Sequence, residues 1–351
     1  HLNVLKYLTV VNWKAAQDQL LDFFTEVEWL LQDKPVRSFD YYYDQVVCVG
    51  ELMSTAMISH YFTEQKIKHK WIDVRDIIRT DSNFRDAAID WRYTEQKVKE
   101  EIEPLFASYD IVLTQGFIGS TDENESTTLG REGSDYSAAI FANLLTADSL
   151  TIWKDVEAVM SADPKAYKNA AIIPALSFTE VIEMAYYGAQ VIHPKTIKPL
   201  QNKNIPLYVK SFIDPSLPGT SITEKLSKNL PPIVVNKDKQ VLIQFKSKDF
   251  SFVEDKPVQQ LHELFHEIKI KPNLSQHTAI SLLCCFDDRP EKIEKLAAAA
   301  SEIFDVEVEK NLLLLTIRHY TEDTINELSS GREIVLMQKT QETVQVLMRQ
   351  V

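Results

Sequence analysis

The stretch TTLGREGSDY, residues 127–136, concentrates groups that bind anions and polar substrates. Arg131 can hold a carboxylate or a phosphate through two parallel hydrogen bonds. Two of the chain's eight glycines flank it, although neither helix nor strand interiors favour glycine. Ser134 and Asp135 are residue types that begin helices, and the free amides of a helix start can hold an anion. The stretch predicts either a substrate loop that enters a helix near Ser134 or Asp135, or a capped helix with Arg131 on the surface.

Polar residues also follow other predicted strands and helices. Asp155 ends the strand pattern LTIWKDV, and α/β sheets place ligand residues at such ends. Lys165 closes the turn DPK and presents a cation there. His193 precedes Pro194, which forces an extended backbone, so a structural role in a turn is favoured over a catalytic base.

Several function classes lose their main support in the sequence. It contains no P-loop, no G-x-G-x-x-G after a strand and no G-x-S-x-G. A net charge of −13 argues against nucleic acid as a partner, because phosphate backbones require basic surfaces. No apolar run approaches about 18 residues, so no membrane span is predicted. The three cysteines form no C-x-x-C pair and predict buried, inert thiols in a reducing cytoplasm.

The elements that must position these groups change along the chain. Before residue 220, apolar strand patterns alternate with helical ones, which predicts a mostly parallel sheet covered by helices. Seven of the eight glycines fall in this part. Short β and α units with almost no glycine follow, an order that fits ferredoxin-like βαββαβ modules. We predict a catalytic domain over residues 1–225, a linker over 226–238 and a C-terminal region over 239–351.

Seven motifs, in this order, resemble those of aspartate kinases in the amino acid kinase family. They are GELMST (50–55), IDVRDIIRT (72–80), TQGFIGS (114–120), TTLGREGSDYSAA (127–139), WKDVEAVMSADPK (153–165), EMAYYGAQVIHPKTI (183–197) and PLYVKSFIDPSLPGT (206–220). The resemblance implies an α/β protein with the three-layer α/β/α amino acid kinase fold. It also implies that the tail forms one complete and one short ACT module of the ferredoxin-like type.

The resemblance implies phosphoryl transfer from ATP, with Mg²⁺, to the side-chain carboxylate of L-aspartate, the first step towards lysine, threonine and methionine. A carboxylate is already ionised, so catalysis consists of positioning and charge neutralisation. By resemblance, Asp135 is the catalytic organiser. Glu51 would hold the substrate ammonium and Arg131 its α-carboxylate, while Gly133 and Ser134 would let the backbone approach the substrate.

Five further positions match the nucleotide side of the family: Lys154, Asp155, Met160, Lys165 and Gln190. Some of them depart from the family pattern. The family usually has a hydroxyl residue at Lys154, a glycine at Ala158, an aromatic residue at Met160 and a lysine at Gln190. We expect these differences to change nucleotide affinity, and Lys154 could itself reach a phosphate.

Two other departures concern the opening stretch and the chain start. The family has a second glycine where Glu132 stands, and this acid must point away from a site for two anions. The family also begins with a lysine and paired glycines on its first strand, whereas no glycine follows Lys6. We infer a trimmed, unresolved or spliced N-terminus, and expect a chain that truly lacks the motif to be nearly inactive.

Regulation, assembly and location are expected from the same resemblance. An amino-acid effector, lysine or threonine, would bind at the turn over residues 246–256, which contains no glycine; a dimerising module without an effector is the alternative. A homodimer or higher homo-oligomer through the ACT region and a cytoplasmic location are expected. Two other functions remain open: a non-catalytic amino-acid sensor, and the kinase part of a bifunctional aspartokinase–homoserine dehydrogenase.

Overall fold

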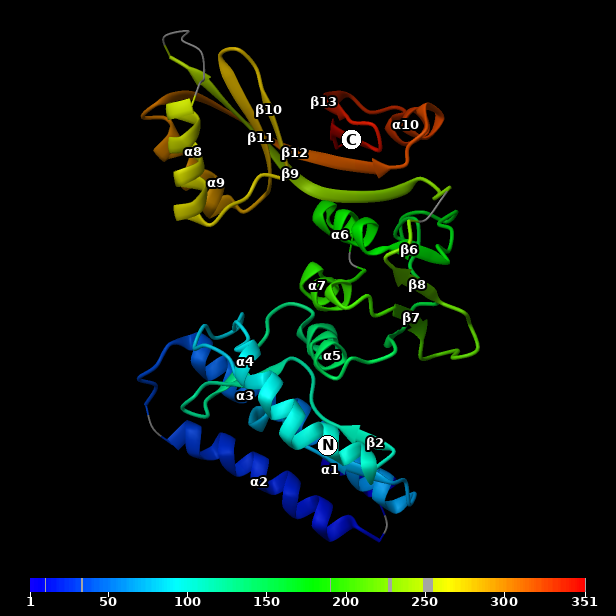
Figure 1. The fold of residues 1–351 in the computed structure, drawn as a ribbon. Coiled ribbons are helices and arrows are strands. Elements are labelled where there is room, and N and C mark those ends of the chain that lie inside the picture. The colour runs from blue at the N-terminus through cyan, green and yellow to red at the C-terminus, as the bar shows by residue number, and fades with distance from the viewer. Residues whose placement is uncertain (10, 33, 190, 227–228, 249–254, 351) are drawn as a thin grey trace. The chain divides into compact units, whose positions relative to one another are not determined.

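The computed structural model describes residues 1–9, 11–32, 34–189, 191–226, 229–248 and 255–350 (Figure 1). The chain divides into two compact units. Unit 1 comprises His1–Glu157, Ala175–Ile182 and Ile192–Leu226, and unit 2 comprises Ala158–Pro174, Glu183–Val191 and Ser227–Val351. Two short segments of the predicted catalytic range therefore belong to unit 2.

The first part of the chain contains seven α-helices and eight short strands among its described residues. The helices are α1 (Leu2–Leu8), α2 (Trp13–Gln32), α3 (Phe39–Glu64), α4 (Trp91–Lys97), α5 (Gly133–Leu144), α6 (Phe178–Tyr187) and α7 (Pro194–Asn202). The strands are β1 (His69–Trp71), β2 (Ile111–Leu113), β3 (Ile118–Ser120), β4 (Ser126–Thr128), β5 (Leu150–Lys154), β6 (Ala175–Ser177), β7 (Leu207–Ser211) and β8 (Thr220–Thr223). Short non-α turns of helix are η1 (Val74–Asp76), η2 (Val98–Ile102) and η3 (Glu103–Ala107).

These strands form three small sheets. β1 and β2 are parallel, β3 and β4 form an antiparallel pair, and the third sheet has the order β5-β7-β8-β6. In that sheet β5 pairs with β7 and β6 pairs with β8 in parallel, whereas β7 and β8 are antiparallel. Parallel pairing thus predominates, as the strand–helix alternation predicts, because each crossover passes through a helix.

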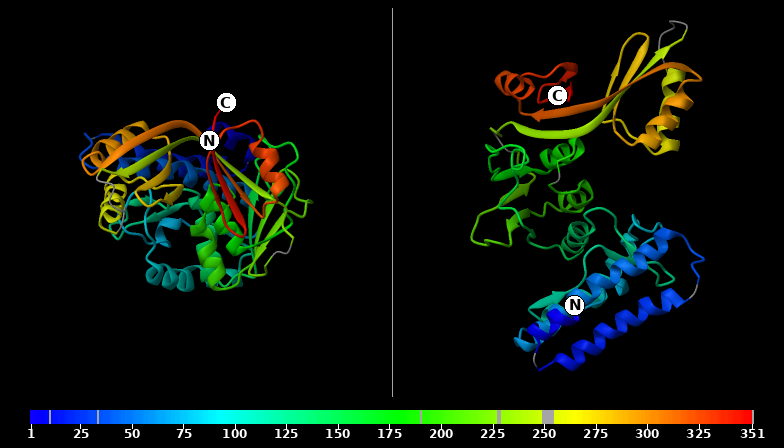
Figure 2. Two further views of the ribbon diagram at one scale, coloured as in Figure 1. Left: turned by 90° about the horizontal axis from the view of Figure 1, so that it is seen from above. Right: turned by 180° about the vertical axis from the view of Figure 1, so that it is seen from behind.

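Helices α2 and α3 run side by side (Figures 1 and 2). Their contact is apolar: Leu20 of α2 and Leu52 of α3 are fully buried. Burial recurs at Cys48, Leu52 and Ala56, the four-residue spacing that places side chains on one helix face. Asp44 of α3, also buried, accepts hydrogen bonds from the Thr128 amide and hydroxyl, both at 2.9 Å. This carboxylate joins α3 to the end of β4, where the glycine-rich stretch begins.

The second part of the chain forms one antiparallel sheet with three helices among its described residues. The elements are β9 (Ile233–Ser247), α8 (Asp255–Ile268), β10 (Leu274–His277), β11 (Ser281–Asp287), α9 (Pro290–Ala300), β12 (Phe304–Arg318), α10 (Glu322–Ser329), β13 (Ile334–Lys339) and β14 (Thr343–Arg349). The sheet order is β10-β11-β9-β12-β14-β13. The run from β9 to β12 has the predicted βαββαβ order. β9 starts at Ile233, inside the range 226–238 that was predicted as a linker.

The two longest strands, β9 and β12, each serve both halves of this sheet. Their pairing changes register around Leu312, and Lys239 and Asn311, with φ of 52° and 60°, lie at this break. Such a bulge bends the strands. Before the break, α8 and α9 lie side by side and pack on the sheet (Figure 1). Beyond it, α10 packs on the C-terminal half of β12 and on β14.

The three cysteines are free and buried, as predicted. Cys284 and Cys285 are neighbours on β11, so their side chains point to opposite faces of the sheet. Cys284 packs in the core under α8 and α9, and Cys285 packs in the cluster on the other face. Burial raises the pKa of Cys284 to about 11 and that of Cys285 to about 12. These thiols stay protonated at neutral pH and are structural.

Candidate active site

A buried glutamine fixes the loop that follows β2. The amide nitrogen of Gln115 donates to the Thr55 hydroxyl of α3 at 2.7 Å, and its amide oxygen accepts from the backbone of Val74 at 2.7 Å. Its side chain satisfies partners on two elements and is only 1% exposed. No role for Gln115 was predicted; the available signal was a polar residue between an apolar strand and Gly116.

The next residue brings α3 and α5 to the same place. The backbone N–H of Gly116 donates to the Glu51 carboxylate at 3.2 Å. A Cβ at position 116 would lie 2.7 Å from the hydroxyl oxygen of Ser134. Since carbon and oxygen cannot approach so closely without a shift, only glycine fits here. Glu51 and Ser134 therefore both lie beside Gly116.

Helix α5 begins at Gly133, with Glu132 as its N-cap. The predicted start near Ser134 or Asp135 is therefore one to two residues late; both lie in the first turn. A Cβ on Gly133 would lie 2.7 Å from the Cβ of Phe117, so the helix start packs directly on the loop after β2. The first amides of a helix have no intrahelical acceptor and carry partial positive charge, which suits an anion.

Asp135 meets Lys154, which stands at the end of β5. The Lys154 ammonium lies 3.4 Å from a carboxylate oxygen of Asp135. Burial raises the pKa of Asp135 above its usual value; the Lys154 charge opposes this shift and the Glu132 charge adds to it. The carboxylate is therefore partly desolvated, which strengthens its electrostatic interaction with Lys154.

The model of the amino acid kinase family matches residues 7–211, more than half of the chain. The chain belongs to the amino acid kinase family. The matched region contains all five residues of the arrangement described above, namely Glu51, Gly116, Ser134, Asp135 and Lys154.

Known relatives agree with the aspartate kinase resemblance. The chain is 38% identical over 190 residues to lysine-sensitive aspartokinase 3 of Escherichia coli K12, covering 54% of this chain and 42% of that protein. It is 40% identical over 186 residues to bifunctional aspartokinase/homoserine dehydrogenase 2 of Arabidopsis thaliana, covering 52% of this chain and 20% of that protein. The segment aligned in sequence thus spans less than half the length of either relative.

A solved structure extends the likeness to the tail. The crystal structure of E. coli aspartokinase III in complex with aspartate and ADP matches with a TM-score of 0.80 and 25% identity. The match covers 98% of this chain and 80% of that one. It confirms the predicted fold class, an α/β amino acid kinase fold followed by ferredoxin-like modules.

Glu132 is the main local departure from the family pattern. Its backbone has φ of 53°, in the left-handed region that favours glycine, which explains the glycine that the resemblance implies at this position. One carboxylate oxygen of Glu132 is buried, and no described residue donates a hydrogen bond to it. Its negative charge makes the smallest contribution to the raised pKa of Asp135, and the expectation that Glu132 points away from the pocket stays a prediction.

The remaining predicted residues lie in different parts of the chain. Arg131 is exposed just before α5, and Asp155 is exposed directly after β5. Met160 and Lys165 belong to unit 2; Met160 forms a bridge with Ile172, and Lys165 is exposed in its predicted turn. Gln190 lies outside the described residues.

His193 has the structural role that its position before proline predicts. It is the N-cap of α7, where its ring nitrogen Nδ1 accepts a hydrogen bond from the Lys195 amide at 3.2 Å. Burial lowers its pKa, so the imidazole stays neutral and able to accept this bond at neutral pH. His193 therefore caps a helix.

No group of three or more His, Cys, Asp or Glu side chains among the described residues is arranged to hold a metal ion. None of the described helices combines the length and the apolar character that a membrane crossing requires.

Proposed function

We propose that this chain has aspartate kinase activity and transfers the γ-phosphoryl group of ATP to the side-chain carboxylate of L-aspartate. The convergence of Glu51, Ser134 and the Asp135–Lys154 pair around the start of α5 carries this proposal. The likeness to a structure that holds aspartate and ADP supports it.

The substrate is held by complementary charges and by the helix start. Glu51 already accepts one hydrogen bond from Gly116, and its second oxygen can accept from the substrate ammonium. Arg131 binds the α-carboxylate through two parallel hydrogen bonds. The absence of side chains at Gly116 and Gly133 lets the loop and helix backbones close on each other, which brings the amides of Ser134 and Asp135 to the substrate.

The phosphoryl side depends on Lys154 and Asp135. ATP supplies the phosphoryl group, and the Mg²⁺ that accompanies its phosphates neutralises part of their charge. Asp135 holds the Lys154 ammonium in place, and Lys154 stabilises the charge that develops on the transferring group. Asp155, Met160, Lys165 and Gln190 are proposed to contact the nucleotide on the basis of the resemblance alone.

Aspartate binding by calorimetry, followed by a coupled assay with aspartate and MgATP, tests this function. We expect Arg131→Ala to weaken aspartate binding by roughly 10- to 100-fold, since charged hydrogen bonds contribute about 1.5–3 kcal/mol. Arg92→Ala, at an exposed position of α4, removes the same charge and should bind like the wild type. A wild-type chain that binds no aspartate, or an Arg131→Ala variant that binds it normally, would contradict the proposal.

We further propose that unit 2 has a regulatory role and that lysine is its effector. A relative named for its lysine sensitivity supports this. The turn over 246–256, where an effector was predicted, includes residues 249–254, which lie outside the described residues. Lysine titrated into the chain during the aspartate assay should lower turnover, and threonine should not.

Assembly and location are proposed only from the resemblance: a homodimer or higher oligomer through the C-terminal region, in the cytoplasm. Light scattering on the purified chain measures the first, and a monomer at all accessible concentrations would contradict it. The bifunctional alternative has a named relative in Arabidopsis thaliana. The sequence of the complete gene decides whether the kinase stands alone or is joined to a homoserine dehydrogenase.

A further inference from the structure

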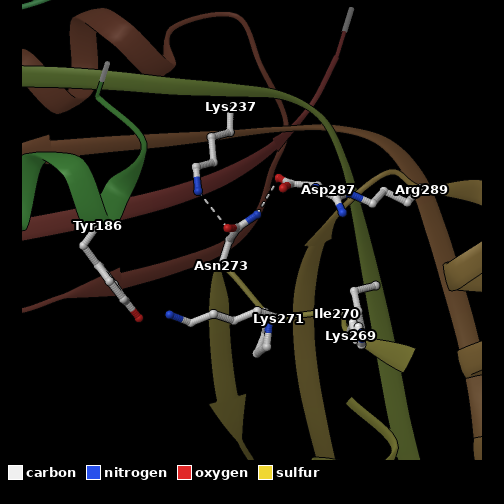
Figure 3. Close-up of a pocket in the computed structure, with 9 residues that line it drawn as sticks. Tyr186, Lys237, Lys269, Ile270, Lys271, Asn273, Asp287 and Arg289 are labelled. Carbon is white, nitrogen blue, oxygen red and sulfur yellow. Dashed lines mark hydrogen bonds between the residues drawn. The ribbon is translucent and has the colours of Figure 1, made fainter. Parts of the chain in front are cut away.

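A cavity of about 300 Å³ is lined by residues of unit 2 alone. It is lined by the end of α6, by β9, by the loop between α8 and β10, and by the turn between β11 and α9 (Figure 3). The lining is unusually basic, with four cationic side chains and one acid: Lys237, Lys269, Lys271, Arg289 and Asp287.

This excess of positive charge is local, because the whole chain has a net charge of −13. Among the described residues, no carboxylate forms an ion pair with Lys237, Lys271 or Arg289. Like charges that face one cavity repel one another, and the repulsion is stronger where solvent is partly excluded. An anion in the cavity would relieve this repulsion.

The one acid is already held by neutral partners. Asp287 accepts hydrogen bonds from the side-chain amides of Asn273 and Gln240, at 2.8 and 3.0 Å. Burial alone would raise its pKa, but these bonds and the charges of Lys237 and Arg289 lower it below the usual value. Asp287 is therefore ionised and fixed in the wall, and it offsets only part of the positive charge.

Lys237 is held in the cavity by the same network. Its ammonium donates to the side-chain oxygen of Asn273 at 2.7 Å, which leaves two further donors (Figure 3). Burial lowers the pKa of Lys237, as expected for a cation without a full counter-charge. Gly188 makes room for it, because a Cβ there would lie 2.5 Å from the Lys237 Cε.

Lys271 and Arg289 line the cavity together with Lys237 and Lys269. The Lys271 ammonium lies 5.0 Å from the centre of the Tyr186 ring, and the two side chains point towards each other (Figure 3). Arg289 is the N-cap of α9, an 11-residue helix, and its side chain makes no capping hydrogen bond. Its guanidinium therefore has no capping role, while the helix start adds partial positive charge.

We propose that this cavity binds the oxyanion head group, phosphate or carboxylate, of a small metabolite. Its volume is at the lower end for small-molecule sites, which begin at about 300 Å³. A neighbouring cavity of about 460 Å³ shares Tyr186 and Lys271 with it and has room for the rest of such a molecule. The site uses residues of unit 2 alone, so it does not depend on the proposed kinase activity.

Isothermal titration of the full chain with inorganic phosphate and with succinate, against chloride at equal ionic strength, tests the site. We expect saturable binding of at least one of the two oxyanions. Saturation by phosphate identifies a phosphate ester as the ligand class, and saturation by succinate identifies a carboxylate. Binding of both supports the shared head-group chemistry, and the absence of saturable binding of either overturns the proposal.

Variants then locate the binding. The double variant Lys271→Ala/Arg289→Ala should weaken it by at least about 10-fold, because charged hydrogen bonds are lost. Lys295→Ala, at an exposed position of α9, removes one charge outside the cavity and should have no effect. If the double variant fails to fold, Lys271→Gln alone should weaken binding measurably. Unchanged affinity in the folded cavity variants, or loss of phosphate binding in Arg131→Ala of unit 1, would overturn the proposal.

Discussion

The candidate anion sites of unit 1 and unit 2 differ in what shapes them, backbone in the first and side chains in the second. In unit 1 the site depends on a close approach of backbones: Gly116 and Gly133 let a loop and a helix start approach until any Cβ would clash. In unit 2 the site is made by side chains, because Lys237, Lys271 and Arg289 reach one cavity from separate elements. A backbone site requires glycine at fixed positions, whereas a side-chain site requires only that long cations converge.

This difference changes what each site does to stability. The start of α5 concentrates unfavourable features, namely the left-handed backbone of Glu132 and the partly buried carboxylate of Asp135. The cavity of unit 2 concentrates like charges instead. Strain and buried charge commonly persist where function requires them. We therefore expect removal of the Asp135 charge in unit 1 to trade activity against stability, and substitutions in the cavity of unit 2 to change mainly ligand affinity.

The largest effect is expected for Asp135→Asn. Turnover should fall by roughly 10²- to 10³-fold, as when one electrostatic contact to a transition state is removed. The folded-state pKa of Asp135 is raised, so its ionisation destabilises the fold as pH rises above the unfolded-state value. The variant should therefore melt at a higher temperature than the wild type at pH 7. At pH values low enough to protonate Asp135 in the wild type, the two melting temperatures should be equal. Equal melting temperatures at pH 7 would contradict the trade-off.

Gly133→Ala tests the close approach of backbones. The added Cβ would meet the Phe117 Cβ at 2.7 Å, so we expect a loss of about 1–3 kcal/mol of unfolding free energy and roughly 10²-fold of turnover. Gly50→Ala is the matched control, because nothing lies within 4 Å of its added Cβ in α3. The control should stabilise the chain by about 0.5–1 kcal/mol. Urea unfolding measures both, and similar values for the two variants would contradict the backbone account.

Glu132→Gly separates backbone strain from charge. Glycine adopts φ of 53° freely, so the variant should be more stable than the wild type by about 1 kcal/mol. Glu132→Ala removes the same carboxylate but keeps a Cβ at the strained position. If the two variants are equally stable in thermal unfolding, the gain comes from the lost charge and the backbone account is wrong.

The smallest effect is expected from the thiols, which compare the two units directly. Cys48 lies in unit 1, and Cys284 and Cys285 lie in unit 2; all three are buried with raised pKa values. No thiol should react with a disulfide reagent in the native chain at pH 8, and three should react in denaturant. In a Cys48→Ser variant only the thiols of unit 2 remain. Comparing its rate of thiol reaction in increasing denaturant with that of the wild type shows which unit opens first. Reaction of one thiol in the native chain would contradict the packing described here.

Much of unit 1 could be predicted from the sequence because its site follows contiguous motifs. The strand, glycine, arginine and helix-start residues of 127–136 stand next to one another in the chain, so their proximity is fixed by connectivity. The start of α5 was misplaced because Ser134 and Asp135 are preferred cap residues, whereas the N-cap is Glu132 in a left-handed conformation. Gln115 was missed because its role depends on Thr55 and Val74, both distant in sequence.

The amino acid sequence by itself determined the family, the alternation of strands and helices and the βαββαβ order of the tail. These follow from local periodicity and from motifs in which neighbours in sequence are neighbours in space. Only the tertiary structure decided that Asp135 pairs with Lys154, and that Lys237, Lys271 and Arg289 face one cavity. Burial and distances between segments far apart in the chain are properties of the packed fold, and no local pattern encodes them.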